Sequence, residues 1–201
     1  QIKEGELLDE RGRLDSLRNE LSSRSARVEE LEELISEKEA IMSTLKNTLA
    51  NALNSFEGNG LSVERRGGKV YVSMENKLLF QSGSWSVGST GKQALKQLGN
   101  VLAANPDIVI LIEGHTDTDP YIGNEHLSGN WDLSTKRATE IVKLLLKNKT
   151  IKPENLTAAG RGEHLPLASN KAAAGKAKNR RIEVILSPKL DKIAELLERV
   201  D

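Results

Sequence analysis

Residues 108–117 read IVILIEGHTD, five apolar residues followed by a polar stretch that ends in an acid. An unbroken apolar run of this length is typical of a central β-strand that is covered on both faces. The polar residues after Ile112 then follow the end of that strand. Asp117 is therefore expected to stand where the strand leaves the sheet.

A helix is predicted a short way beyond this strand. Residues 130–138 read NWDLSTKRA, and residues 131–149 have helical apolar spacing. Asn130 is a natural N-cap for this helix, and Arg137 falls in its first turns. A carboxylate at a strand end and a guanidinium on a neighbouring helix make a plausible clamp for a ligand that carries both an ammonium and a carboxylate. Such a pair favours binding over catalysis.

The elements around this pair indicate helices and strands in one globular domain. Residues 61–66 and 69–74 alternate in polarity around Gly67 and Gly68, which predicts a hairpin with a two-residue turn. A helix is expected at residues 91–104. Further strands are expected at residues 156–159 and 181–186. Helices that alternate with strands around one sheet give an α+β fold, an α/β sandwich of about 130 residues, which is large enough to fold alone.

The first part of the chain carries an unbroken seven-residue repeat, which predicts a coiled coil. Arg27 at position g can reach Glu32 at position e of a parallel neighbour, so a parallel homodimer is favoured. A single solvated helix within a larger assembly is the alternative. The apolar positions of the repeat are Leu7, Leu14, Leu21, Val28, Ile35, Met42, Leu49 and Phe56 at a, with Leu17, Leu31, Leu45 and Ala52 at d.

Three segments follow from these patterns: a coiled-coil stalk at 1–57, a globular domain at 58–188 and an amphipathic helix at 189–201. The last segment follows Pro188 and should dock on the globular domain or pair with a partner chain. Its apolar stripe consists of Leu190, Ile193, Leu196, Leu197 and Val200.

Composition excludes several classes of protein. The 29 basic and 29 acidic side chains balance, and aromatic residues make up 3% of the chain, so no nucleic-acid partner is expected. Cysteine is absent, which excludes disulfides and thiol nucleophiles. No apolar run suggests a membrane span. The chain starts at Gln1 without Met, so we expect a fragment that lacks its natural N-terminus, together with any anchor or targeting signal there.

Four motifs in order resemble the OmpA-like (OmpA/MotB) peptidoglycan-binding domain. They are GHTD at 114–117, NWDLSTKRA at 130–138, GRGE at 160–163 followed by Pro166, and NRRIEV at 179–184. The resemblance covers about residues 61–187. It implies a mixed sheet with helices in a βαβαβ-type order.

The resemblance also implies noncovalent binding of the peptidoglycan stem peptide, chiefly its diaminopimelate residue, by Asp117 and Arg137. No cofactor is implied. Free N–H groups at the start of the second motif's helix would add positive partial charge beside a ligand carboxylate. Arg180 and Arg181 are further candidate contacts, unless strand alternation points Arg181 to solvent, and Arg180 is taken as a site residue. The ligand-binding residues expected on this basis are Thr116, Asp117, Asn130, Leu133, Arg137 and Arg180.

Other chemistries find less support in the sequence. His115, His126 and His164 lack the close spacing of metal ligands, so no metal site is expected. A glycosidase needs two carboxyl groups across a cleft, and Asp117 with Asp119 or Glu113 does not establish one. The loop at 118–129 is longer than in the shortest OmpA-type domains. The sequence does not decide whether its polar residues Asp119, Tyr121 and His126 contact the glycan or contact nothing.

The resulting expectation is a noncatalytic periplasmic protein that tethers the envelope to peptidoglycan, attached to the outer membrane. A stator-type anchor of an ion-driven motor, in the inner membrane, is the alternative within the family. A coiled-coil scaffold for a protein partner and a muralytic enzyme are the alternatives from other classes.

Overall fold

The computed structural model describes residues 2–81, 84–123 and 127–198. Contacts along the chain divide it into two units. One consists of Ile41–Lys189, and the other of Gln1–Ala40 together with Leu190–Asp201.

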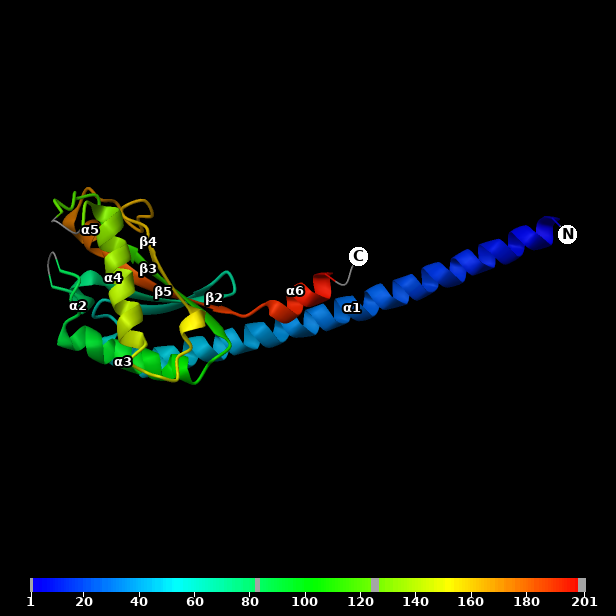
Figure 1. Ribbon diagram of the computed structural model, residues 1–201, viewed down its shortest axis with the longest axis horizontal. Helices are drawn as coiled ribbons and strands as arrows, with labels where there is room; N and C mark the ends of the chain where they lie inside the picture. Colours follow the sequence, from blue (N-terminus) through cyan, green and yellow to red (C-terminus); the bar gives the residue numbers. More distant parts are fainter. Residues whose placement is uncertain (1, 82–83, 124–126, 199–201) are drawn as a thin grey trace. The chain divides into compact units, whose positions relative to one another are not determined.

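The larger unit contains a five-stranded mixed sheet in the order β1-β2-β5-β3-β4 (Figure 1). β3 and β4 pair in parallel and the other neighbours are antiparallel, so the mixed sheet expected from the sequence is confirmed. The strands are β1 at Leu61–Arg66, β2 at Lys69–Glu75, β3 at Ile108–His115, β4 at Leu156–Gly160 and β5 at Arg181–Pro188.

The predicted hairpin is β1 and β2. Gly67 and Gly68 both have positive φ, 55° and 71°, which is the conformation that a two-residue turn of this kind requires at both central positions. Alternate residues of β2, namely Val70, Val72 and Met74, are buried, so the hairpin places one face in the core.

Helices cover one face of the sheet. The core gathers alternate residues of the strands, such as Ile112 and Val184, with residues from the helices, such as Leu98 and Ile141. The helices of this unit are α2 at Asn76–Leu79, α3 at Ser89–Ala103, α4 at Asn130–Leu145 and α5 at Ala173–Asn179, with 3₁₀ turns η1 at Asn54–Phe56 and η2 at Pro153–Asn155.

The opposite face of β3 departs from the sequence expectation. Val109 is 39% exposed and Leu111 is half-buried, so the start of this apolar strand is covered on one face only. Further along, Glu113 and His115 are buried on that same face. The expectation of two covered faces was wrong for the first half of the strand, because helices pack on one side of the sheet alone.

The long helix α1, Ile2–Leu53, passes from one unit into the other. The heptad positions Met42, Leu45 and Leu49 are almost fully buried and belong to the globular core, as does Phe56. The globular unit therefore begins at Ile41, well before the predicted boundary at residue 58. The reason is that apolar residues spaced for a helical partner are equally well spaced for packing on a sheet.

The smaller unit contains the first part of α1 and helix α6, Asp191–Glu198. The heptad residues of this part of α1 lie at the surface, and Leu21 is 66% exposed. By its contacts α6 belongs with residues 1–40 and not with the sheet; Leu196 is buried, and Val200 lies outside the described residues. Among the helices described, none combines the length and the apolar character needed to cross a membrane.

Candidate functional site

Two glycines allow helix α4 to sit directly on the ends of β3 and β4. Gly114 pairs with Gly160 across these strands. A Cβ atom at Gly114 would lie 2.1 Å from the carbonyl oxygen of Ser134, and one at Gly160 would lie 2.2 Å from Thr135 Oγ1. Only residues without a side chain permit this approach. It brings the first turns of α4 against the point where β3 leaves the sheet.

Hydrogen bonds then join the strand end, the helix and the loop after β4. The backbone N–H of Thr116 donates to the carbonyl of Gly162 (2.8 Å), and the N–H of Gly162 donates to Ser134 Oγ (3.1 Å). Gly162 has a φ of 53°, which turns the loop back toward α4. Thr116 and Asp117 are thereby fixed beside the helix that carries Arg137.

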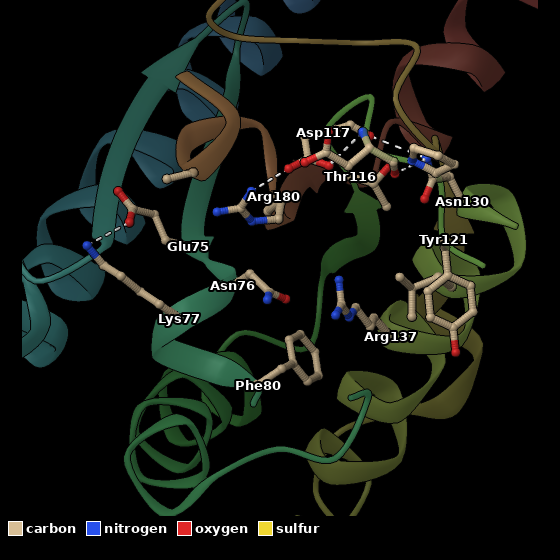
Figure 2. Close-up of a pocket in the computed structure, with 14 residues that line it drawn as sticks. Glu75, Asn76, Lys77, Phe80, Thr116, Asp117, Tyr121, Asn130, Arg137 and Arg180 are labelled. Atoms are coloured by element: carbon tan, nitrogen blue, oxygen red, sulfur yellow. Dashed lines mark hydrogen bonds and ion pairs between the residues drawn. The ribbon is translucent and has the colours of Figure 1, made fainter. Parts of the chain in front are cut away.

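A cavity of about 570 Å³ opens at this junction (Figure 2). All six residues that the sequence marks as ligand-binding line it, which brings together segments that are more than sixty positions apart. The lining consists of Glu75, Asn76, Lys77, Phe80, Thr116, Asp117, Asp119, Pro120, Tyr121, Asn130, Leu133, Arg137, Ala177 and Arg180.

Asp117 has Arg180 as its ion-pair partner. A guanidinium N–H of Arg180 donates to Oδ2 of Asp117, and the backbone N–H of Asp119 donates to Oδ1 (3.1 Å). The Asp117 side chain is 6% exposed, whereas that of Arg180 is 39% exposed. The carboxylate is thus held in one orientation at the wall of the cavity, with an arginine that can reach solvent.

Arg137 has a different environment. Its Nε and Nη2 groups both donate to the carbonyl oxygen of Ser84, at 3.1 and 3.0 Å. Its guanidinium carbon lies 5.2 Å from the centre of the Phe80 ring. Arg137 is 4% exposed, and burial lowers its pKa to about 10; Tyr121 and the charge of Asp117 act in the opposite direction, and the charge of Arg180 adds to the lowering. It remains a cation at neutral pH.

Asn130 does not cap α4, contrary to the sequence expectation. The helix begins at Asn130 itself, with Gly129 in the cap position and no side-chain cap hydrogen bond. The Asn130 amide instead donates to the carbonyls of Asp117 (3.4 Å) and Asp119 (3.1 Å). Its role is to hold the strand-end loop against the helix.

The cavity is electrically balanced. Three acidic and three basic side chains line it: Glu75, Asp117 and Asp119, with Lys77, Arg137 and Arg180. Glu75 pairs with Lys77 at 2.9 Å, while Asp119 pairs with Lys176 outside the lining at 2.6 Å. The buried hydroxyl of Thr116 has no hydrogen-bond partner among the described residues. The walls therefore carry charges of both signs, most of them already in ion pairs, and Arg137 is the lining cation whose hydrogen bonds go to a carbonyl.

Several lining residues were not expected from the sequence. Phe80 lies just after α2, a four-residue helix with no periodic signal, and contacts Arg137; Ser84, which accepts the hydrogen bonds of Arg137, follows outside the lining. Glu75 ends β2, and Lys77 is the second residue of the same short helix. The sequence signal there was a short apolar run, Leu78, Leu79 and Phe80, ahead of a Gly/Ser-rich stretch.

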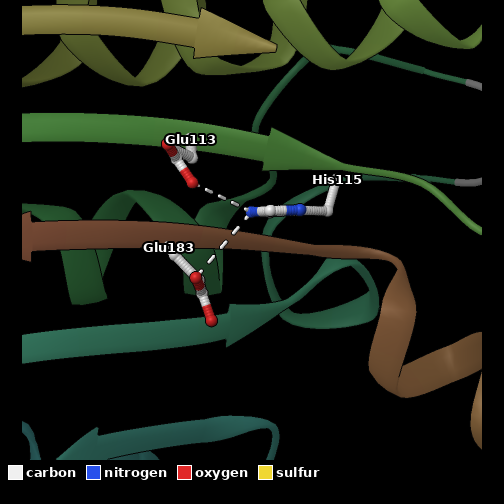
Figure 3. Close-up of side chains that lie close together, drawn as sticks. All are labelled: Glu113, His115 and Glu183. Carbon is white, nitrogen blue, oxygen red and sulfur yellow. Dashed lines mark ion pairs between the residues drawn. The ribbon is translucent and has the colours of Figure 1, made fainter. Parts of the chain in front are cut away.

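A second group of ionisable residues lies on the face of the sheet away from the helices. Glu113, His115 and Glu183 are each at most 3% exposed, and their facing atoms lie close together (Figure 3). His115 Nε2 is 3.6 Å from Glu113 and 3.8 Å from Glu183. Both of its ring nitrogens lack a hydrogen-bond partner among the described residues.

Arginines already occupy the outer oxygens of both carboxylates. Arg161 donates twice to Glu113 (2.7 and 3.0 Å), and Arg181 donates to Glu183 (3.1 Å). Burial, together with the positive charges of Arg181 and Arg161, lowers the pKa of His115 to about 3. A positive potential of this kind opposes a bound cation, so we assign no metal to the group.

The same contacts settle two readings of the sequence. Arg181 does not point to solvent: it is 2% exposed, because the sheet face beyond it is covered. Glu113 does not line the cavity and is bound to Arg161, so it does not form a carboxylate pair with Asp117. Of the other histidines, His164 contacts Trp131 and Glu163, and His126 lies outside the described residues.

Comparison with known proteins agrees with this architecture. The OmpA family model matches residues 79–180, which include α3, β3, α4, β4, α5 and the whole strand-end junction. The chain belongs to the OmpA family. The family resemblance and the fold expected from the sequence are thus confirmed.

The similar proteins of this family include motility and wall-anchoring proteins. Motility protein B of Bacillus subtilis is 37% identical over 120 residues, which are 60% of this chain and 46% of the relative. The chain therefore matches less than half of that relative's length. A MotB-like protein from Desulfovibrio vulgaris superposes with a TM-score of 0.71, at 24% identity over 78% of this chain and 96% of the other, and supports the fold. The cell wall anchor of the T6SS from Pseudomonas aeruginosa gives 0.63, at 31% identity over 70% and 97%.

Proposed function

We propose that this OmpA-family domain binds peptidoglycan noncovalently and takes a zwitterionic residue of the stem peptide, of the diaminopimelate kind, in the cavity at the end of β3. In this proposal Asp117 accepts hydrogen bonds from the ligand ammonium and Arg137 donates to the ligand carboxylate. Arg180 holds Asp117 in place, and Thr116 supplies a hydroxyl.

The observation that carries the proposal is the environment of Arg137. It is a buried cation, and the hydrogen bonds found for it within the described residues go to a neutral carbonyl, that of Ser84. A buried charge without an opposite charge in direct contact is costly, and a carboxylate would compensate it through charge-assisted bonds. The ligand's positive end then needs an acid, which Asp117 provides across the same cavity.

The balance of charge in the cavity supports a zwitterion over a simple anion or cation. Three acids and three bases leave no formal net charge among the lining side chains. A ligand that carries both charges on one carbon centre loses little electrostatic free energy on entering such a site, because each of its charges contacts an opposite charge. The structural similarity to the cell wall anchor of the T6SS from Pseudomonas aeruginosa also supports the proposal.

Pelleting with purified sacculi tests the proposal. Asp117→Ala and Arg137→Ala should each weaken binding at least about thirtyfold, since truncating one partner of a buried charge pair costs about 2 kcal/mol or more. Arg137→Lys should also bind less, because an ammonium does not reproduce the planar fork. Release of soluble fragments from the sacculi would indicate an enzyme instead.

Two controls separate loss of the site from loss of the fold. Arg181→Ala also removes a buried arginine but lies outside the cavity, and Glu154→Ala removes an exposed acid far along the chain. Both should still pellet at a temperature at which they are folded. If Asp117→Ala and Arg137→Ala pellet as well as these controls, the clamp is refuted.

In the cell, we propose that the domain lies in the periplasm and anchors an envelope assembly to the wall. The relation to a motility protein favours a stator-type anchor as the second candidate. The discriminating observation is the segment that precedes the chain in the full-length protein. A membrane helix with an ionisable residue would favour the stator, and a lipid-modified N-terminus would favour an outer-membrane tether.

A further inference from the structure

An exposed aromatic pair lies beside the cavity. Trp131, in the first turn of α4, is 54% exposed, and its ring centre is 5.2 Å from that of His164 with a tilt of 30°. The His164 side chain is 56% exposed. Neither ring belongs to the hydrophobic core, so this surface is not needed to build the sheet domain.

The pair is held on rigid supports. The Trp131 carbonyl accepts hydrogen bonds from Ser134 Oγ and Thr135 Oγ1, both at 2.9 Å. The loop that carries His164 is tied to β3 through the N–H of Arg161, which donates to the carbonyl of Gly114 (2.9 Å). A rigid, half-exposed tryptophan is the kind of residue that carries binding energy, because it buries a large area at a small entropic cost.

We propose that Trp131 and His164 form a stacking platform for a sugar ring of the glycan strand, which makes the domain read the glycan together with the stem peptide. This inference rests on the proposed function of the cavity. A pyranose ring has an apolar face of C–H groups that fits an aromatic surface, and hydroxyl groups around its rim that need hydrogen-bond acceptors.

The neighbouring charges favour a neutral partner of this kind. Glu163 lies 3.8 Å from His164, and Asp132 follows Trp131 on the helix. These carboxylates would repel an anionic surface, but they accept hydrogen bonds from hydroxyl groups. The platform therefore combines an apolar face with acceptors at its edge.

The spacing also suits a peptide that joins the two sites. Asn130 lines the cavity and Trp131 is the next residue, so the ring lies within about 10–12 Å of that wall, the width of a helix with its side chains. A stem peptide of three residues, measured from its attachment to the sugar to the end of its third residue, spans roughly 10 Å at full extension. One muropeptide can therefore reach the cavity and the platform together.

Titration calorimetry with two ligands tests the platform: the free stem tripeptide, and the same tripeptide attached to its disaccharide. The unmodified protein should bind the disaccharide form about three- to tenfold more tightly, which is the affinity gain expected of one aromatic contact. Trp131→Ala should remove this gain and leave the affinity for the free tripeptide unchanged. Val109→Ala, which truncates an exposed apolar residue at the other end of β3, should keep the gain.

The outcomes separate the two proposals. Equal affinity of the unmodified protein for both ligands, or an equal loss of both in Trp131→Ala, would overturn the platform and leave the cavity's function standing. Failure of the unmodified protein to bind the free tripeptide would overturn both. In a Trp85→Phe background the remaining tryptophan is Trp131. Its fluorescence should then change with the disaccharide form and not with the tripeptide.

Discussion

Adding one methyl group at Gly114 should disrupt both the fold and the site. The Cβ atom of an alanine there would lie 2.1 Å from the carbonyl oxygen of Ser134 and 2.8 Å from its carbonyl carbon. Ordinary contacts of this kind are about 3.4 Å or longer, and the obstructing atoms are helix backbone that cannot rotate away. Helix α4 must therefore move by about 1 Å or more from β3.

The cost follows from this overlap. Overpacking in a dense core costs about 1–3 kcal/mol, and a clash with backbone belongs at the upper end or above it. For a domain of this size we expect a fall in melting temperature of about 6–12 °C from a loss of about 3 kcal/mol. Because α4 carries Asn130, Leu133 and Arg137, its displacement should also weaken sacculus binding below the melting temperature.

Gly99→Ala provides a matched control in the same unit. Gly99 lies inside α3, and its new Cβ would sit 3.6 Å from Leu145 Cδ2, an ordinary van der Waals contact. The helix propensity of alanine should then stabilise the protein by up to about 1 kcal/mol. Urea unfolding measures both variants. If Gly114→Ala is as stable as Gly99→Ala, the account of the helix–strand contact is refuted.

Two further predictions concern the stalk and the buried histidine. Because the apolar seam of α1 is exposed, the chain should be a dimer in sedimentation equilibrium at tens of micromolar. Replacing Leu21 and Val28 with Asp should give a monomer. A monomeric parent chain would contradict the coiled coil. His115 has a pKa of about 3 in the folded state against about 6.5 when unfolded, so the unfolded state takes up the proton first. The free energy of unfolding should therefore fall by about 1 kcal/mol per pH unit below pH 6.5. In His115→Gln the free energy of unfolding should change less with pH between 6.5 and 5. Equal pH dependence in the two proteins would disprove the assignment to His115.

Local patterns were sufficient to predict the strands and the position of the site. The glycine pair at 67–68, the apolar run at 108–112 and the helical spacing at 131–149 each depend on neighbours along the chain, and each corresponds to an observed element. The six residues expected at the site came from motifs at strand and helix ends, and all six line the cavity. Their action on a ligand stays a prediction.

The partners of those residues were not predictable in the same way. Asp117 pairs with Arg180, 63 positions away, and Arg137 bonds to Ser84, 53 positions away in an irregular segment. No periodicity specifies such pairs, because they depend on how separate loops meet above the sheet. The heptad pattern was ambiguous for a related reason: it specifies which side of α1 is buried, and leaves open whether a second coiled-coil helix or the globular core covers Met42 and Leu49.

The two groups of ionisable residues near the end of β3 differ in how far their charges are compensated, and this difference assigns their roles. Glu113 and Glu183 each accept hydrogen bonds from an arginine, and the space between them holds a neutral histidine, so the group is closed and stabilises the fold. Arg137 is equally buried, but the acceptor found for it is a carbonyl that carries no full charge. Replacing that carbonyl with a ligand carboxylate strengthens the electrostatic interaction without any new burial of the arginine, since its desolvation has already been met in the folded protein. In the proposed function, the free energy that the fold spends on burying Arg137 is recovered on binding, which is why we place the ligand carboxylate at this arginine and not at the fully paired Arg181.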